Sequence, residues 1–473
     1  MNIVDAMTDA SLFGSHFRGS SWQAWRVFLS ALFGLPITDD DAVAVYLECT
    51  GRTPPVTPYP SKIAALVVGR RGGKSLILAL VSVFLATFRD YSAYLAPGEV
   101  GTVAILAADR RQARSIFRYV AGLLESVPML AAMIEEQTTE TVTLNNRVVI
   151  EIATASFRVT RGYTFVAVLA DEVAFWRTED SVNPDREIIA ALRPGLATIP
   201  GSMLLLASSP YRKRGVLWDA FAKNFGRDDG RGTLVWRAPT ATMNPRLDPQ
   251  IIADAYEEDA ESAAAEYGAE FRSDLSDFVQ RSVVEAATPT GRAEIAPMST
   301  QSYVAFVDPS GGSADSMTLG ISHREGERVI LDAIREVKPP FSPEQVTKDF
   351  ADLLKSYRIR KVCGDRYAGE WPRERFRVHG ISYELSDEPK SEIYLNFLPV
   401  LNSGRAQLLA LPRLQSQLLG LERRTGRSGR DSIDHAPGGH DDVANAAAGA
   451  LLLAAKTARA RPARSITLNW MGR

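Results

Sequence analysis

The sequence predicts an α/β protein built from two domains, and three observations support this prediction. The chain has 473 residues, more than one ordinary hydrophobic core accommodates. Its 45% hydrophobic and 23% charged residues are normal for a globular protein. Short runs of branched apolar residues alternate with helical patterns, which is typical of sheets flanked by helices. We expect domains at residues 1–285 and 286–456, followed by a basic tail at 457–473.

The composition argues against several classes of protein. A net charge of −2 does not fit a uniformly basic nucleic-acid coat, although local basic clusters occur, for example at 212–214. Cys49 and Cys363 have no histidine or cysteine at ligand spacing, which argues against a disulfide framework or a zinc site. The apolar stretch 76–88 is shorter than the roughly 20 residues that cross a bilayer. The N-terminus lacks a secretion signal pattern, so we expect a cytoplasmic chain without a membrane partner.

A candidate phosphate-binding loop follows the predicted strand 64–68 and precedes an apolar helix. It consists of Gly69, Arg70, Arg71, Gly72, Gly73, Lys74 and Ser75. Such a loop presents backbone N–H groups to phosphates, while Lys74 reaches the terminal phosphates of ATP and Ser75 ligates Mg²⁺. Val68 stands where the usual pattern has its first glycine, so a plain glycine-rich turn remains the alternative.

A second apolar strand, 164–170, ends in Asp171 and Glu172. In a parallel sheet beside the loop, Asp171 would hold the metal and Glu172 would orient the water that attacks the γ-phosphate. The alternative is a strand followed by an acidic helix cap. A further strand, 202–207, leads into Ser208 and Ser209, which predicts a γ-phosphate sensor. Together these features predict a RecA/ASCE-like P-loop ATPase domain.

Three carboxylate sites mark the second half of the chain. Three successive strands, at 304–308, 317–322 and 328–334, predict a meander compatible with an RNase H-like fold. Asp308 ends the first of them, Asp365 ends a later strand, and Asp441 opens the last helix. Carboxylates are the ligands that Mg²⁺ or Mn²⁺ prefers, and two such ions cleave phosphodiesters. The alternative is that these acids are helix caps and turn residues.

Other residues near these acids complete the predicted site. Asp442 and Asp315 are auxiliary ligand candidates, and His440 is a candidate contact to DNA or to the metal's water. The segment 425–439 is rich in Gly, Ser, Asp and Arg and predicts a mobile loop beside the acids. Its arginines suit contacts to DNA phosphates that read no sequence.

In its motifs the chain resembles the large terminase subunits of tailed double-stranded DNA bacteriophages over nearly its whole length. The resemblance rests on the loop 69–75, Gln112-Ala113, Arg161-Gly162, Asp171-Glu172, Ser208-Ser209-Pro210, Met243-Asn-Pro245, Glu266 to Phe271 and Gly439-His-Asp-Asp442, which occur in the family's order. It implies ATP-driven translocation of DNA into the procapsid and metal-dependent cleavage of concatemeric DNA. It also favours the nuclease over the alternative of structural acids.

The resemblance implies further roles for individual residues. Ser208 and Ser209 would couple hydrolysis to movement. Arg158 and Arg161 are candidates for an arginine finger, and Arg70 and Arg71 compete for that role. Upstream, Trp22-Gln23 resembles the family's adenine-side segment.

The same resemblance implies partners and a location. We expect double-stranded DNA, a small terminase subunit and the portal protein as partners, and a ring, most simply a pentamer, during packaging. The chain would act in the host cytoplasm and transiently on the portal, and would be absent from the mature virion. Two alternatives are an ATP-dependent helicase or repair nuclease, and a catalytically inactive DNA-binding component.

Overall fold

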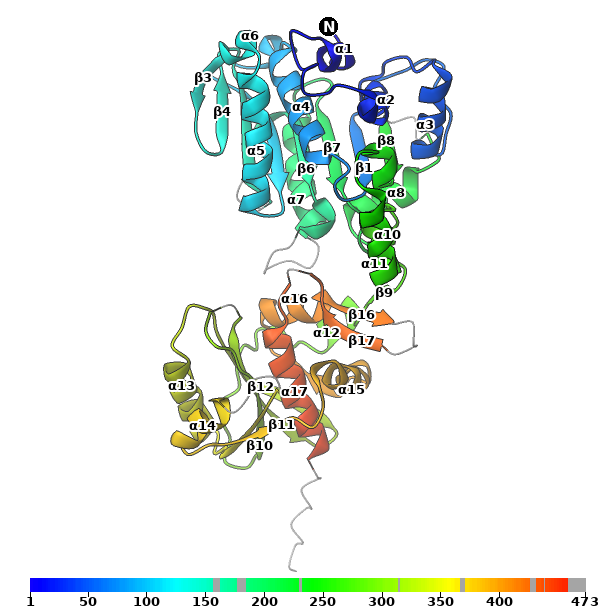
Figure 1. The fold of residues 1–473 in the computed structure, drawn as a ribbon. Coiled ribbons are helices and arrows are strands. Elements are labelled where there is room, and N and C mark those ends of the chain that lie inside the picture. Colours follow the sequence, from blue (N-terminus) through cyan, green and yellow to red (C-terminus); the bar gives the residue numbers. More distant parts are fainter. Residues whose placement is uncertain are drawn as a thin grey trace, which may run out of the picture. The chain divides into compact units, whose positions relative to one another are not determined.

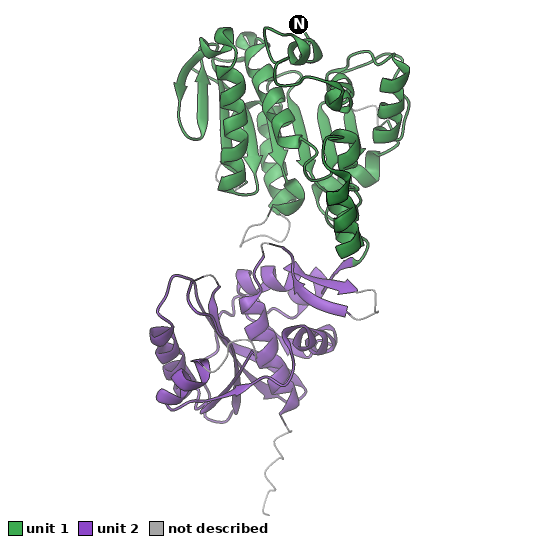
Figure 2. Cartoon of the chain, in the orientation of Figure 1, with its two compact units in different colours: residues 1–274 green, residues 275–473 purple. Residues whose placement is uncertain are grey.

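The computed structural model describes residues 1–155, 162–176, 184–228, 232–313, 315–365, 371–425, 431–437 and 439–457. It divides the chain into two compact units, residues 1–274 and 275–473 (Figure 2). Both units are α/β, as the sequence predicts. Within the described ranges, no helix is long and apolar enough to span a membrane.

The second unit begins earlier than the boundary near residue 285 suggested by the sequence. β9 (Leu275–Asp277) pairs with β16 (Leu421–Thr425). α12 (Arg281–Ala286) then contacts α15 (Lys390–Asn402) and α16 (Pro412–Gly420). These contacts join residues that are distant in sequence, so a local change in periodicity does not mark the boundary.

An eight-stranded sheet forms the centre of the first unit, in the order β3-β4-β5-β2-β6-β7-β1-β8. Its strands are β1 (Ile63–Val68), β2 (Gly101–Ala107), β3 (Ile134–Gln137), β4 (Thr141–Leu144), β5 (Val148–Thr154), β6 (Thr164–Asp171), β7 (Met203–Ser208) and β8 (Thr233–Ala238). Within this order, all neighbouring strands in the part β5-β2-β6-β7-β1-β8 run parallel. β7 lies between β1 and β6, which is the predicted RecA/ASCE-like arrangement, and the carboxyl ends of these three strands share one edge.

Helices bury both faces of this sheet (Figure 1). One face packs against α1 (Ile3–Thr8), α2 (Gln23–Phe33), α3 (Asp40–Thr50), α4 (Lys74–Thr87), α5 (Arg110–Glu125) and α6 (Pro128–Ala131). The other packs against α7 (Pro184–Leu192) and α8 (Val216–Asn224). Alternate strand residues serve opposite faces: Leu66 belongs to the first core and Val67 to the second. Burial on both faces explains why these strands read as continuous apolar runs.

The second unit is built on a six-stranded mixed sheet in the order β14-β13-β10-β11-β12-β15. Its strands are β10 (Tyr303–Asp308), β11 (Met317–Glu325), β12 (Arg328–Val337), β13 (Lys361–Gly364), β14 (Ser382–Leu385) and β15 (Ala406–Gln407). β10, β11 and β12 form an antiparallel meander, and β13 and β14 continue the sheet in parallel from β10. The meander predicted from the sequence is confirmed, and the sheet agrees with the predicted RNase H-like fold.

Helices also cover both faces of the second sheet. α13 (Pro343–Ser356) and α14 (Trp371–Val378) pack on one face. α17 (Asp442–Lys456) contacts β10, β11 and β12, which lie behind it in Figure 1. Close approach of α17 depends on glycine, because a Cβ on Gly449 would overlap the ring of Phe306. The position of α17 matters for function because its first turn carries predicted site residues.

We expect Gly449→Ala to lower the free energy of unfolding of the second unit by about 1–3 kcal/mol, because Phe306 must move to admit the methyl group. Gly420→Ala is a matched control in α16, where the added Cβ meets nothing within 4 Å. It should leave stability unchanged or raise it slightly. Urea denaturation of the full chain, followed by circular dichroism, measures both. Equal midpoints for the two variants would contradict the close contact between α17 and β10.

The segment 425–439 differs from the predicted loop. Residues 431–435 form β17 (Asp431–His435), which pairs antiparallel with β16 in a three-stranded sheet completed by β9. Ile433 is buried, and its backbone N–H donates to Ser391 Oγ at 2.7 Å. The loop prediction is therefore wrong for this stretch, because Ile433 is its single large apolar residue and polar composition hid the strand. Residues 426–430 and 438 lie outside the described ranges.

Candidate active sites

The glycine-rich segment 69–73 connects β1 to α4 at the carboxyl edge of the first sheet. Lys74 is almost fully buried, and its Nζ donates to the carbonyl oxygens of Val68 at 2.9 Å and Gly69 at 3.2 Å. Gly73 has a φ of 97°, a left-handed conformation that favours glycine. The segment therefore has the strand–loop–helix setting that a phosphate-binding loop requires.

Distant segments hold this loop in place. Trp25 Nε1 donates to the Gly72 carbonyl at 2.9 Å, and Thr240 Oγ1 donates to the Arg70 carbonyl at 2.8 Å. Asn244 Nδ2 donates to the Arg71 carbonyl at 2.9 Å, and the Arg70 backbone N–H donates to the Glu266 carbonyl. Two motifs singled out in the sequence, Met243-Asn-Pro245 and Glu266 to Phe271, thus contribute atoms that support the loop. Trp25 was not predicted, because nothing local links it to a loop so far along the chain.

Asp171 lies at the end of β6 and is buried. Its Oδ2 accepts hydrogen bonds from Ser75 Oγ at 3.3 Å and from Gln112 Nε2 at 3.1 Å. Its Oδ1 is buried without a hydrogen-bond partner among the described residues. Burial, together with the neighbouring Glu172, raises the pKa of Asp171 well above its ordinary value. A cation beside Ser75 and Asp171 would relieve this cost, so these residues fit the Mg²⁺ that accompanies ATP.

Glu172 connects the ends of three strands. It has a φ of 49°, a left-handed value that is uncommon outside glycine. Its Oε1 lies 3.6 Å from Lys74 Nζ, while its Oε2 accepts from Ser208 Oγ at 2.9 Å and from the Ser209 backbone N–H at 3.3 Å. The structure therefore brings Lys74, Glu172 and Ser208–Ser209 together. Strained backbone at such a point is common where a side chain must be aimed at a reactant.

The arginine-finger candidates are placed unequally. Arg70 is exposed and pairs with Glu266, with Nη1 and Oε1 3.1 Å apart. Arg71 lies in the loop with a φ of 63°. Arg158 and Arg161 fall outside the described residues. In the proposed adenine-side segment, Trp22 packs edge-on against Phe17 at 4.9 Å between ring centroids.

The predicted carboxylates of the second unit line one pocket. Asp308 ends β10, Asp365 directly follows the parallel neighbour β13, and Asp441 and Asp442 open α17. All four line a pocket of about 660 Å³. Asp315 and His440 also line it, with Asp315 Oδ1 and His440 Nδ1 3.8 Å apart. The pocket thus collects carboxylates from three segments that are far apart in the sequence.

The acids of this pocket are crowded and partly buried. Burial raises the pKa of Asp308 to about 8. A hydrogen bond from Asn445 Nδ2 at 2.8 Å lowers this pKa in part, and the negative charges of Asp442, Asp441 and Asp365 raise it further. Burial and the charge of Asp441 raise the pKa of Asp442 to about 6. Asp442 Oδ2 is buried and has no hydrogen-bond partner within the described ranges. Hard oxygen ligands that repel one another in this way fit a divalent cation.

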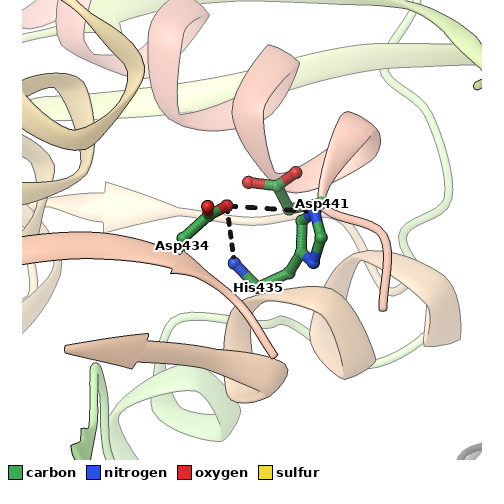
Figure 3. A group of neighbouring side chains, drawn as sticks. All are labelled: Asp434, His435 and Asp441. Carbon is green, nitrogen blue, oxygen red and sulfur yellow. Dashed lines mark hydrogen bonds and ion pairs between the residues drawn. The ribbon is translucent and has the colours of Figure 1, made fainter. Parts of the chain in front are cut away.

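Several residues in and beside this pocket were not predicted. Figure 3 shows Asp434, His435 and Asp441 converging, and one ligand atom from each lies within 4.8 Å of the others. Tyr394 Oη donates to Asp441 Oδ2 at 3.0 Å, and Lys390 Nζ lies 3.1 Å from the same oxygen. The strand β17 and the helix α15 bring these side chains to the acids. The sequence placed the segment of Asp434 and His435 beside the acids but gave neither residue a role, and no local pattern linked Lys390 and Tyr394 of α15 to Asp441.

Comparisons with known proteins give structural matches. No family model matches the chain, and no curated protein matches it. The large terminase of bacteriophage HK97 matches 91% of this chain and 99% of its own, with 16% identity and a TM-score of 0.38. The large terminase of a thermophilic bacteriophage matches 82% of this chain and 91% of its own, with 11% identity and a TM-score of 0.36.

A third match covers a smaller part of the chain. The large terminase nuclease of thermophilic phage G20c aligns over 36% of this chain and 95% of its own, with 15% identity and a TM-score of 0.32. All three TM-scores lie below 0.5.

Proposed function

We propose that this chain is the large terminase subunit of a tailed bacteriophage, combining an ATP-driven DNA-packaging motor with a metal-dependent DNA nuclease. The observation that carries the proposal is the pairing of two sites in one chain. One unit joins a phosphate-loop lysine to an acidic strand end, with Lys74 and Glu172 3.6 Å apart. The other gathers Asp308, Asp365, Asp441 and Asp442 around one pocket.

The first site supports hydrolysis of ATP. The loop 69–73 leads into α4, and the backbone N–H groups of that helix's first turn would face the phosphates. Lys74 supplies positive charge, and Ser75 and Asp171 offer oxygen ligands for Mg²⁺. Glu172 would act as the base that orients the attacking water. Its bonds to Ser208 and Ser209 give a direct link from that base to β7. We propose that this link transmits the state of the γ-phosphate to the sheet.

The second site supports phosphodiester cleavage. Asp308, Asp365, Asp441 and Asp442 would hold divalent cations, Mg²⁺ or Mn²⁺. Bound there, the cations would activate a water molecule and stabilise the leaving oxygen. Asn445 fixes one oxygen of Asp308, and Tyr394 fixes one oxygen of Asp441, so the protein itself orients two of the four carboxylates.

The helicase alternative fits the second unit less well. A helicase of two RecA-like domains needs a second nucleotide-facing parallel sheet. The second unit has instead a mixed sheet with an antiparallel meander, and its acids lie where a phosphate loop would be needed. An inactive DNA-binding component would not need the full set of acids and the Lys74–Glu172 pair.

The proposal extends to partners and place of action. The chain would act on double-stranded DNA with a small terminase subunit and the portal protein, as a ring that is most simply a pentamer. It would work in the host cytoplasm, transiently on the portal. Its contacts to DNA would be to phosphates, so binding should weaken as salt rises.

Two assays on the same purified preparation test the proposal. We expect ATP hydrolysis that double-stranded DNA stimulates, and plasmid cleavage that needs Mg²⁺ or Mn²⁺ and stops with EDTA. Cleavage should not require ATP, because the two sites use separate residues. ATP hydrolysis without any metal-dependent cleavage, over a range of salt concentrations, would support the motor function and contradict the proposed nuclease function.

A further inference from the structure

A lysine lies inside the acidic pocket of the second unit. Lys390, the first residue of α15, lines the pocket together with Asp308, Asp365 and Asp441. Its Nζ is 3.1 Å from Asp441 Oδ2 and 2.9 Å from Asp434 Oδ1. The side chain is 29% exposed, and that of Asp441 is 6% exposed, so water screens this pair weakly.

The fold holds Lys390 against Asp441. Tyr394, one helical turn further along α15, donates its hydroxyl to the same Asp441 Oδ2 at 3.0 Å. Ser391, between them, accepts a hydrogen bond from the backbone of Ile433, which fixes β17 and therefore Asp434 beside the helix. Residues of α15 thus hold both carboxylate partners of the lysine in place: Tyr394 contacts Asp441, and Ser391 fixes the strand that carries Asp434.

Three of the predicted metal-binding acids differ in the groups that contact their carboxylates. Asp441 has a lysine in direct contact, whereas Asp308 accepts from the neutral amide of Asn445 and Asp442 has an oxygen with no partner among the described residues. The lysine also has a second carboxylate within reach, because Asp434 Oδ1 lies 2.9 Å from its Nζ; the Asp434 side chain is 48% exposed. An ammonium on a flexible stem can keep one partner when it leaves the other.

We propose that Lys390 is an internal cation that competes with a divalent metal ion for Asp441, and that Asp434 holds the ammonium when the metal binds. The inference rests on the proposed nuclease function, in which Asp441 is a metal ligand. A divalent cation and an ammonium cannot share one carboxylate oxygen at low cost, since like charges at contact distance repel strongly in a weakly screened site. Lys390 therefore lowers the metal affinity of the empty pocket and sets the metal concentration at which the nuclease becomes competent.

The test is Mn²⁺ binding to the full chain without DNA, measured by calorimetry and by the Mn²⁺-dependent rise in Tm. We expect Lys390→Met, which keeps the length of the side chain without its charge, to bind Mn²⁺ about tenfold or more tightly than wild type. Its metal-free Tm should fall, because Asp441 keeps the hydrogen bond from Tyr394 but loses its positively charged partner. Lys355→Met is the matched control, since Lys355 pairs with Asp352 on the surface of α13 at 3.3 Å, and it should bind Mn²⁺ as wild type does.

Substitution of Asp434 should change the Mn²⁺ affinity in the opposite direction from substitution of Lys390. Asp434→Asn leaves the ammonium with Asp441 alone, so Mn²⁺ should bind more weakly than to wild type. In the double variant Lys390→Met/Asp434→Asn this weakening should vanish, because Asp434 then has no lysine to hold. Weakening that persists in the double variant would show that Asp434 itself ligates the metal, and would overturn its assigned role.

Unchanged or weaker Mn²⁺ binding by Lys390→Met would overturn the competition. That failure is distinct from failure of the proposed function, which Asp308→Asn reports in the same assay. Binding that depends on Asp308 supports the metal site, whatever the result for Lys390. Binding that is absent from wild type, or that is unaffected by Asp308→Asn, would remove the metal site and the competition with it.

Discussion

Replacing Glu172 by Gln is expected to slow ATP hydrolysis by about 100- to 10,000-fold, the range that loss of a general base costs. Glutamine keeps an oxygen that can accept from Ser208 and Ser209, so the ends of β6 and β7 should stay together. It cannot take a proton from the attacking water. ATP should still bind, because the substitution removes the ion pair with Glu172 but leaves Lys74 itself in place to contact the phosphates. Single-turnover hydrolysis and equilibrium binding of a fluorescent ATP analogue measure the two effects separately.

A second glutamate beside the loop supplies the control. Glu266 pairs with Arg70 at 3.1 Å, but both side chains are exposed, and an exposed ion pair contributes about 1 kcal/mol or less. Glu266→Gln should therefore change turnover only slightly. If Glu172→Gln hydrolyses ATP at close to the wild-type rate, Glu172 is not the base, and another carboxylate must orient the water.

Replacing Asp308 by Asn is expected to abolish metal-dependent DNA cleavage while sparing ATP hydrolysis. The loss should exceed the roughly 10- to 100-fold that changing an outer partner of a metal ligand costs, because a ligand itself is removed. The fold should tolerate the change, since burial already raises the pKa of Asp308 to about 8 and asparagine resembles the uncharged form. Plasmid nicking at fixed Mn²⁺ concentration, with ATP turnover measured in the same preparation, tests this.

Asp315 is the matched control for Asp308. It lines the same pocket but its side chain is 65% exposed, so Asp315→Asn should reduce cleavage far less. Equal losses of cleavage and ATP turnover in Asp308→Asn would point to a folding defect or to tight coupling of the two units. Cleavage at the wild-type rate would exclude Asp308 as a ligand.

Candidate site residues could be named from the sequence where the local order of strands and turns points to them. A strand that runs into a glycine-rich turn, or that ends in an acid, is visible without a structure, because strand ends on one sheet edge meet whatever the loops between them do. Lys74, Asp171, Glu172, Ser208, Asp308 and Asp365 were named in this way, and Asp441 and Asp442 from the start of the last helix; the structure brings the first four to one sheet edge and the four aspartates to one pocket. The motif order added a family resemblance that no single motif would carry.

The sequence performed less well where contacts are long-range. The boundary at 285 missed the pairing of β9 with β16, and the loop prediction for 425–439 missed β17. In both places short polar strands are stabilised by partners from elsewhere in the chain, so their own composition carries little strand signal.

By itself, then, the sequence predicted the fold class, which the structure confirms, and named candidate residues for a nucleotide site and for a metal site. Only the tertiary structure decided what surrounds them. Trp25 supports the phosphate loop, and Lys390 and Tyr394 contact the carboxylate of Asp441. The partners in these contacts are 47 or more residues apart in the sequence. Such contacts depend on how helices pack on the sheets, and packing leaves no periodic or local pattern in the sequence that could identify the partner.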